Sequence, residues 1–267
     1  MQIIRTANEL TKVLTVHNNI GFVPTMGCLH EGHLSLLVRS LTYNKITVCS
    51  IFVNPAQFND QTDFEKYPIT IDADIEKLKS LKVDFLFLPS VTEIYPENYP
   101  DKLYDLGTLE SKWEGAFRPG HFQGVCKVMD RLLEIIPATD LWMGQKDFQQ
   151  CLVVQKLLEL THRTKIQFHR VETSRDDKGL ALSSRNQRLS ETAKEKAAAL
   201  YESLSMIRKS YKIQFFEYLV TLATDNLLRK GFEKVEYIDL IQTESETVVA
   251  AAAWIEGVRL IDNIILN

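Results

Sequence analysis

Two histidines, His30 and His33, stand three residues apart where a strand-like segment gives way to a helix-like one. Residues 20–23 read as a buried strand, Pro-Thr-Met-Gly at 24–27 breaks it, and leucines follow at helical spacing. Such a junction directs backbone N–H groups and the positive end of the helix dipole to one point, which suits phosphate. Both imidazoles, on one face of the first helical turn, can donate hydrogen bonds to phosphate or protonate a leaving oxygen. The pair can also cap the helix or bind zinc, but H-x-x-H without further Cys or His nearby is a poor zinc set.

Amide side chains follow the next predicted strand, in the sequence Asn54-Pro55-Ala56-Gln57. An amide pair can bind hydroxyl and carboxylate oxygens because it offers both donors and acceptors. Asn-Pro is also an ordinary turn, so binding and turn formation are both open. Residues 117–124, dense in glycine and cationic side chains, form either a lid, a phosphate contact or a rigid surface turn.

Two later segments carry charges suited to a nucleotide. In 144–150, Lys146 offers a compact charge for phosphate, and Asp147 favours a helix start and can orient a ribose or a metal-bound water. In 182–186, hydroxyls and an arginine at a domain junction suit a mobile phosphate clamp. The alternative for 144–150 is an ordinary solvated face, and the alternative for 182–186 is a charged, helix-capping linker. All these segments follow a strand or the junction, which favours one ligand site.

The elements that position these segments fall into two patterns. Up to about residue 175, strand-like and helix-like stretches alternate, which predicts an α/β fold with a Rossmann-like, doubly wound parallel sheet. From Ser190 on, helix formers precede three strand-like runs with short turns, which predicts a smaller α+β domain with a short antiparallel sheet. We therefore expect domains 1–175 and 176–267. The strands are expected at 46–53, 83–88, 140–143, 166–171, 235–241, 248–254 and 258–265, and helices at about 71–81, 124–136, 148–160 and 215–230 and from residue 191.

Composition excludes several classes of partner. The 267 residues are 45% hydrophobic and 25% charged, typical of a soluble globular protein. With 31 basic and 35 acidic residues the net charge is −4, which argues against nucleic acid or an anionic membrane as main partner. No apolar run reaches the ~20 residues of a membrane helix and no signal peptide is visible, so we expect a cytoplasmic protein. The four widely spaced cysteines fit reduced thiols.

The segment PTMGCLHEGHLSL resembles the PTMGALHEGHLSL motif of the pantoate–β-alanine ligase (pantothenate synthetase) family. SIFVNPAQF, FRPGHFQGV, GQKDFQQ and LALSSRN resemble that family's later motifs in the same order, and RLIDNI resembles its C-terminal end. The likeness spans essentially the whole chain. The H-x-G-H sequence alone would indicate only the wider nucleotidyltransferase superfamily.

The resemblance implies that ATP adenylates pantoate with release of pyrophosphate, and that β-alanine then attacks pantoyl adenylate to give pantothenate and AMP. It implies a homodimer and a requirement for Mg²⁺, for which no ligand residue is assigned. Carried over by motif, His33 acts as proton donor or main stabiliser of the leaving phosphates, helped by His30, with Lys146 facing the phosphates. Pantoate is bound by Gln57 and Gln150, and β-alanine lies near Gln57 and Asn54. The ATP contacts implied are Met26, Gly27, His30, His33, Gly144, Lys146, Asp147, Ser174, Leu182, Ser183, Ser184 and Arg185.

A few positions depart from the family pattern. Cys28, Gln145 and Leu182 replace the usual small residue, glutamate and methionine. Ser174 stands where an apolar residue usually offers its backbone to adenine. Two rival functions remain: a nucleotidyltransferase that adenylates a phosphorylated small molecule, and a non-catalytic nucleotide-binding module. The first gives no reason for the two glutamines, and the second would be expected to have lost His30, His33 or Lys146.

Overall fold

The computed structural model describes residues 1–266, which form two compact units. The first unit contains residues 1–144 and 149–171, and the second contains residues 145–148 and the chain from Glu172 onward. The short segment 145–148 thus belongs to the second unit although the first surrounds it in sequence. The assignment of functional domains at 1–175 and 176–267 stays a prediction.

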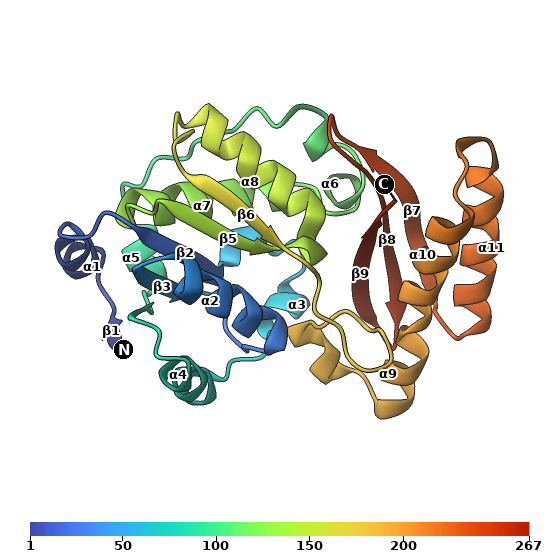
Figure 1. Cartoon of the computed structure of the whole chain (residues 1–267), viewed down its shortest axis with the longest axis horizontal. Coiled ribbons are helices and arrows are strands. Elements are labelled where there is room, and N and C mark those ends of the chain that lie inside the picture. The colour runs from blue at the N-terminus through green and yellow to red at the C-terminus, as the bar shows by residue number, and fades with distance from the viewer. Residues whose placement is uncertain (267) are drawn as a thin grey trace. The chain divides into compact units, whose positions relative to one another are not determined.

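The first unit is built on a six-stranded parallel sheet with strand order β1-β4-β3-β2-β5-β6, whose strands other than β4 are labelled in Figure 1. The order reverses between β2 and β5, which are neighbours in the sheet. In a parallel α/β sheet such a reversal opens a crevice at the carboxyl ends of the strands, where ligands bind. The strands are β1 Gln2–Ile4, β2 Ile20–Thr25, β3 Ile46–Ile51, β4 Phe85–Phe87, β5 Asp140–Gly144 and β6 Gln167–Val171.

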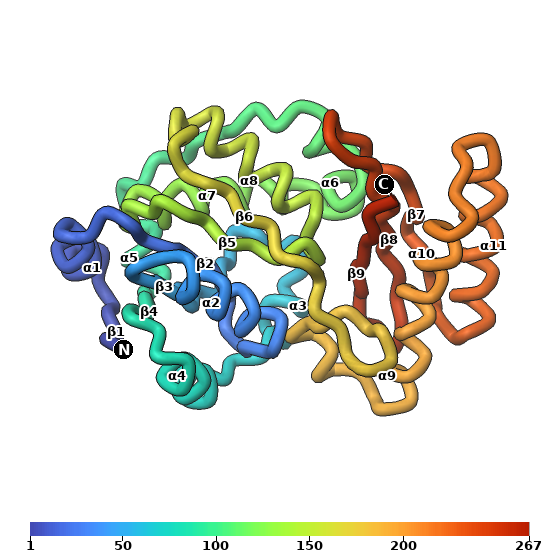
Figure 2. Tube along the Cα trace, viewed as in Figure 1, coloured from blue at the N-terminus to red at the C-terminus, as the bar shows by residue number. Residues whose placement is uncertain are grey.

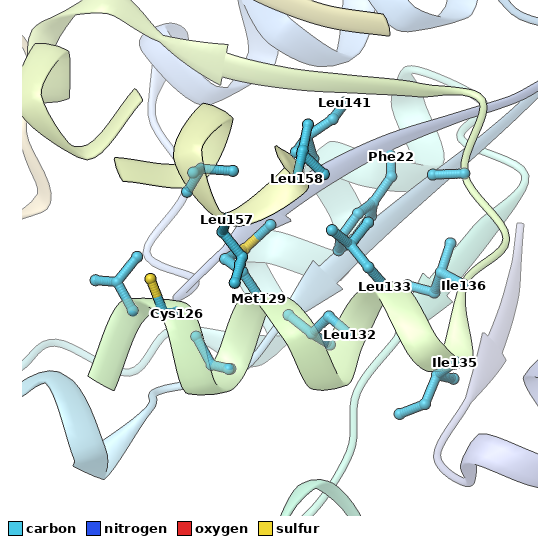
Figure 3. Packing of buried hydrophobic residues seen from close by; sticks show 14 of the residues in the cluster. Phe22, Cys126, Met129, Leu132, Leu133, Ile135, Ile136, Leu141, Leu157 and Leu158 are labelled. Carbon is cyan, nitrogen blue, oxygen red and sulfur yellow. The ribbon is translucent and has the colours of Figure 1, made fainter. Parts of the chain in front are cut away.

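Helices cover both faces of this sheet because side chains along each buried strand alternate between two apolar clusters. Phe22 and Leu141 join the cluster that includes α7 and α8, and Figure 3 shows Met129 of α7 beside Leu157 of α8. Their strand neighbours join the opposite cluster with residues of α2 and α4. The helices are α1 Ala7–Leu14, α2 Glu31–Tyr43, α3 Gln61–Glu65, α4 Ile71–Ser80, α5 Val91–Ile94, α6 Glu114–Phe117, α7 His121–Ile135 and α8 Phe148–Leu160.

The second unit pairs an antiparallel sheet, in the order β7-β8-β9, with three helices. The three strands run next to one another in the tube of Figure 2. Ser190 caps α9 by accepting the Ala193 N–H at 3.1 Å, and Gly231 follows α11 at φ +97°, a left-handed conformation that glycine tolerates. The elements are α9 Glu191–Ala197, α10 Ala199–Ser210, α11 Phe216–Arg229, β7 Lys234–Gln242, β8 Thr247–Ile255 and β9 Val258–Ile265.

The predicted fold class is confirmed for both sheets. Two predicted details were wrong, and several short elements were missed. Pro24 does not break the strand: β2 continues to Thr25, which is tolerated because pairing with β5 ends at Phe22, before the residue that lacks an N–H. The helix expected from residue 191 divides at Ala198 into α9 and α10. The three-residue β1 and eight-residue α1 were not predicted, since such short elements have little periodicity to detect.

Candidate active site

The turn that follows β2 is held by a buried carboxylate from α4. Asp74, fully buried, accepts the Cys28 N–H at Oδ2 and the Leu29 N–H at Oδ1, both at 2.8 Å. Lys77 of the same helix donates to the Leu29 carbonyl at 2.5 Å. The prediction that this turn offers its N–H groups to phosphate was therefore wrong for Cys28 and Leu29, because the chain supplies its own anion. Gly27 and Cys28 have φ values of +81° and +49°, so the tight turn also explains a small residue at 28.

The two histidines cap α2 reciprocally. Gly32 N–H donates to His30 Nδ1 at 3.2 Å, and His30 N–H donates to His33 Nδ1 at 3.4 Å, while the rings lie 4.1 Å apart between centroids. His30 is thus the N-cap residue, outside the helical turn where it was predicted. A ring nitrogen that accepts a hydrogen bond carries no proton, so each neutral imidazole carries its proton on Nε2. Capping and a donor role toward phosphate are therefore compatible. No cluster of metal-ligating side chains occurs within residues 1–266.

The buried amide of Asn54 makes its hydrogen bonds to other groups of the protein. Its Oδ1 accepts from the Ala56 N–H at 3.2 Å and the Tyr95 hydroxyl at 2.9 Å. Its Nδ2 donates to Gln57 Oε1 at 3.0 Å and to the Gly124 carbonyl at 3.1 Å. Burial and then the neighbouring Tyr99 raise the pKa of Tyr95, so its hydroxyl stays a donor well above neutral pH. Asn54 thus fixes the orientation of the Gln57 side chain.

Gln57 also touches the turn after β2, because its Nε2 lies 3.2 Å from Met26 Sδ. The backbone carbonyl oxygen of Gln57 lies 2.8 Å from Nδ1 of the buried His121, and Nε2 of His121 lies 3.0 Å from the Arg118 guanidinium. The glycine-rich segment 117–124 therefore supports Gln57. Of the three interpretations, a rigid turn fits these contacts, but the segment is not wholly at the surface, because His121 and Gly124 are buried at the start of α7.

Two adjacent glutamines open α8 and have different surroundings. Gln149, 3% exposed, accepts from the Glu114 N–H at 2.8 Å and donates to the Leu109 and Lys112 carbonyls. Gln150 is half-buried and makes no side-chain hydrogen bond to any residue in the described part of the chain. Of the two, Gln150 is thus the one able to bind a ligand.

The remaining predicted residues lie in the second unit, apart from Gly144 at the end of β5. Lys146 Nζ donates to Asp147 Oδ1 at 3.1 Å. Leu182 N–H donates to the Ser174 carbonyl at 2.9 Å, and Ser183 Oγ accepts the Arg185 N–H at 3.3 Å. Ser184 is buried beside them. The structure therefore forms two local groups, one around Lys146 and one joining residue 174 to residues 182–185.

Three supporting residues were missed or given another role from sequence: Asp74, Tyr95 and Gly124. The role of Asp74 cannot be read from the sequence, since nothing around it links it to a turn 46 residues earlier. Tyr95 has no motif around it. Gly124 stood within a motif, but its contact with Asn54 joins residues 70 apart.

Comparison with known proteins shows the family of this chain. A family model described as pantoate-beta-alanine ligase matches residues 2–265. The chain belongs to the pantoate–β-alanine ligase family. It is 40% identical to a pantothenate synthetase of Cytophaga hutchinsonii, over 94% of this chain and 92% of that protein.

Solved ligase structures share the whole fold. The crystal structure of pantothenate synthetase from Thermus thermophilus is 35% identical, covers 100% of this chain and 99% of its own, and gives a TM-score of 0.89. The Francisella tularensis pantoate–β-alanine ligase, complexed with "Beta-gamma ATP" and β-alanine, gives a TM-score of 0.87 at 35% identity, covering 100% of this chain and 98% of that one.

Membership in the ligase family makes this chain an enzyme that joins pantoate to β-alanine, not a non-catalytic nucleotide-binding module. ATP is its nucleotide substrate. Within residues 1–266 there is no helix both long enough and apolar enough to cross a membrane.

Proposed function

We propose that this chain makes pantothenate through a pantoyl adenylate, with the site residues in the roles that their geometry suits. The observation that carries this proposal is the contact between Gln57 Nε2 and Met26 Sδ at 3.2 Å. It places the amide proposed for pantoate beside the turn that leads into the two histidines. Pantoate and the phosphates of ATP would then lie next to each other, as attack of one on the other requires.

The first step needs no protein nucleophile. A carboxylate oxygen of pantoate attacks the α-phosphorus of ATP, the bond to the bridging oxygen breaks, and pyrophosphate leaves. The Nε2–H groups of His30 and His33 would donate to phosphate oxygens as negative charge develops on them, and Lys146 would add a cation. Gln57 and Gln150 would hold pantoate, and Asp147 the ribose.

In the second step the amine of β-alanine attacks the acyl carbon, AMP leaves with the electrons of the broken C–O bond, and the new amide nitrogen loses a proton to water. Gln57 would orient β-alanine, whereas Asn54 would act through Gln57 because its own amide is fully hydrogen-bonded. Met26, Gly27, Gly144, Ser174, Leu182, Ser183, Ser184 and Arg185 would complete the ATP contacts.

Mg²⁺ would accompany ATP and neutralise phosphate charge. Asp74 does not fit as a ligand, since both of its oxygens already accept backbone N–H groups. Phosphate oxygens and water would supply most of the ligands, because Mg²⁺ loses its bound water reluctantly.

The test mixes enzyme, ATP, Mg²⁺ and pantoate with and without β-alanine, and measures AMP, pyrophosphate and the amide product. We expect AMP and pantothenate to form together only when β-alanine is present. AMP formation that ignores β-alanine and yields no amide would refute the proposal and favour the nucleotidyltransferase.

We also propose that the enzyme is a homodimer and is located in the cytoplasm. Its functional domains would be residues 1–175 and 176–267. Light scattering should give twice the mass of one chain, and a mass of one chain would exclude the dimer.

A further inference from the structure

Asn263, on the last strand, holds the turn that bears Lys146. Its side chain is 2% exposed, and Nδ2 donates to the carbonyl oxygens of Gln145 and Lys146, both at 2.9 Å. Gln145 Nε2 returns a hydrogen bond to Asn263 Oδ1 at 3.3 Å. One buried amide therefore fixes two consecutive peptide groups of the turn.

Asp262, the preceding residue, holds a different segment. Adjacent side chains of a strand point to opposite faces of the sheet, so Asp262 lies on the same face as Leu260 and Ile264. These two residues belong to the apolar cluster that includes α10 and α11. The side chain of Asp262 is 2% exposed, and its carboxylate accepts two hydrogen bonds from Arg175, at 2.5 and 2.8 Å. This paired geometry fixes the guanidinium as well as neutralising the buried charge.

Arg175 connects Asp262 to the segment that carries predicted ATP contacts. Its guanidinium lies 3.7 Å from the centroid of the Tyr201 ring and donates to the Gly179 carbonyl at 3.1 Å. Residue 175 pairs with Ala181 in an antiparallel bridge. The ends of this narrow loop are Ser174 and Leu182, joined by the hydrogen bond described above.

We propose that Asn263 is a positioning residue for the turn of Lys146 and Asp147, and that Asp262 anchors the loop between Ser174 and Leu182 from the other face of the same strand. This inference rests on the proposed function, which gives both segments to ATP. It assigns a role to the closing RLIDNI segment, whose adjacent Asp and Asn serve two nucleotide-binding segments at once.

Asn263→Asp is the sharpest test, because a carboxylate keeps the shape of the amide and removes both N–H donors. Its oxygen would face two carbonyl oxygens and repel them. Asn226→Asp is the matched control: Asn226 Nδ2 donates to Ser203 Oγ at 3.1 Å, between α11 and α10 of the same unit.

In steady-state assays we expect Asn263→Asp to raise the KM for ATP and lower kcat, so that kcat/KM for ATP falls by about 10- to 100-fold. The KM for pantoate should stay within about twofold of wild type, as should every constant of Asn226→Asp. A merely structural role would reduce the amount of folded enzyme and lower kcat without changing the KM for ATP. Asp262→Asn should also raise the KM for ATP selectively.

An unchanged KM for ATP in folded Asn263→Asp overturns the role of Asn263, and the same result in Asp262→Asn overturns that of Asp262. If circular dichroism shows that Asn263→Asp is unfolded, Asn263→Ala, which adds no charge, is assayed against the same criterion. The wild-type assay distinguishes failure of the proposed function from failure of this inference. A wild type that makes no pantothenate refutes the proposed function, whereas an active wild type with an unaffected variant refutes only the role of the last strand.

Discussion

His33 accepts a backbone hydrogen bond at Nδ1, so its donor capacity lies at Nε2. We predict that His33→Ala lowers the rate of pantoate adenylation by about 10²-fold, the effect of losing one preorganised donor. Lys146→Ala should act similarly. Pyrophosphate release in single turnovers measures the rate. His162→Ala, which removes an exposed imidazole, is the control. Near-normal rates in folded His33→Ala would contradict the role given to His33.

Gln57 is held by Asn54 and offers its amide beside Met26. Gln57→Ala should mainly raise the KM for pantoate, because the amide would bind the acid before and during reaction alike. Gln61→Ala, an exposed glutamine nearby, is the control. An effect confined to the KM for ATP would show that the amide was assigned to the wrong substrate.

Asp74 is the least replaceable carboxylate near the histidines, because both of its oxygens accept N–H groups. In Asp74→Asn the amide NH₂ would face one of these donors, which would lose its partner. We expect the free energy of unfolding, measured in urea, to fall by about 1–3 kcal/mol. We also expect kcat to fall by about 10-fold or more as the turn before His30 shifts.

Asp72→Asn changes an exposed carboxylate on the same helix and should leave both quantities unchanged. Wild-type stability and kcat in Asp74→Asn would show that the turn does not depend on this carboxylate.

Helix α7 approaches the 3₁₀ turn Pro55–Gln57 so closely that only glycine fits at position 124. A Cβ there would overlap the Ala56 carbonyl oxygen and lie 2.8 Å from Gln57 Cα. We predict that Gly124→Ala displaces the turn, lowers the thermal melting temperature and raises the KM for pantoate more than that for ATP. An active variant with unchanged constants would mean that α7 and the turn can separate without moving Gln57.

The stability of the whole chain should fall in alkali. Burial, the largest cause, raises the pKa of Cys49 and of Cys126 from 9.0 to about 12. The folded protein therefore keeps protons that the unfolded chain loses above about pH 9, so the unfolded state binds fewer protons and stability decreases as pH rises. Burial raises the pKa of Tyr104 too, which adds to the same trend.

Urea unfolding followed near pH 7 and near pH 10 measures this dependence. The double variant Cys49→Ala, Cys126→Ala should lose less stability across this interval than the wild type. An equal loss in both proteins would mean that the thiols are not responsible.

The sequence by itself determined the fold class, most strands of the two sheets and the segments proposed to carry the chemistry. Period-two and helical spacing are local properties, and so are the strand–turn–helix junction of residues 20–39 and the caps at Ser190 and Gly231. The order of the family motifs then indicated the reaction. These features need no knowledge of which distant residues meet.

Only the tertiary structure decided how the side chains are used. Asp74 accepts hydrogen bonds from N–H groups that the local pattern predicted to bind phosphate. The amide of Asn54 is hydrogen-bonded to Gln57, and Asn263 holds the turn of Lys146. The hydrogen bonds that join Asp74 to Cys28 and Leu29, and Asn263 to residues 145 and 146, each span at least 45 positions, so no local spacing encodes them. A buried polar group must find its partner wherever the folded chain brings one, which is why the supporting residues of the site became visible only in three dimensions.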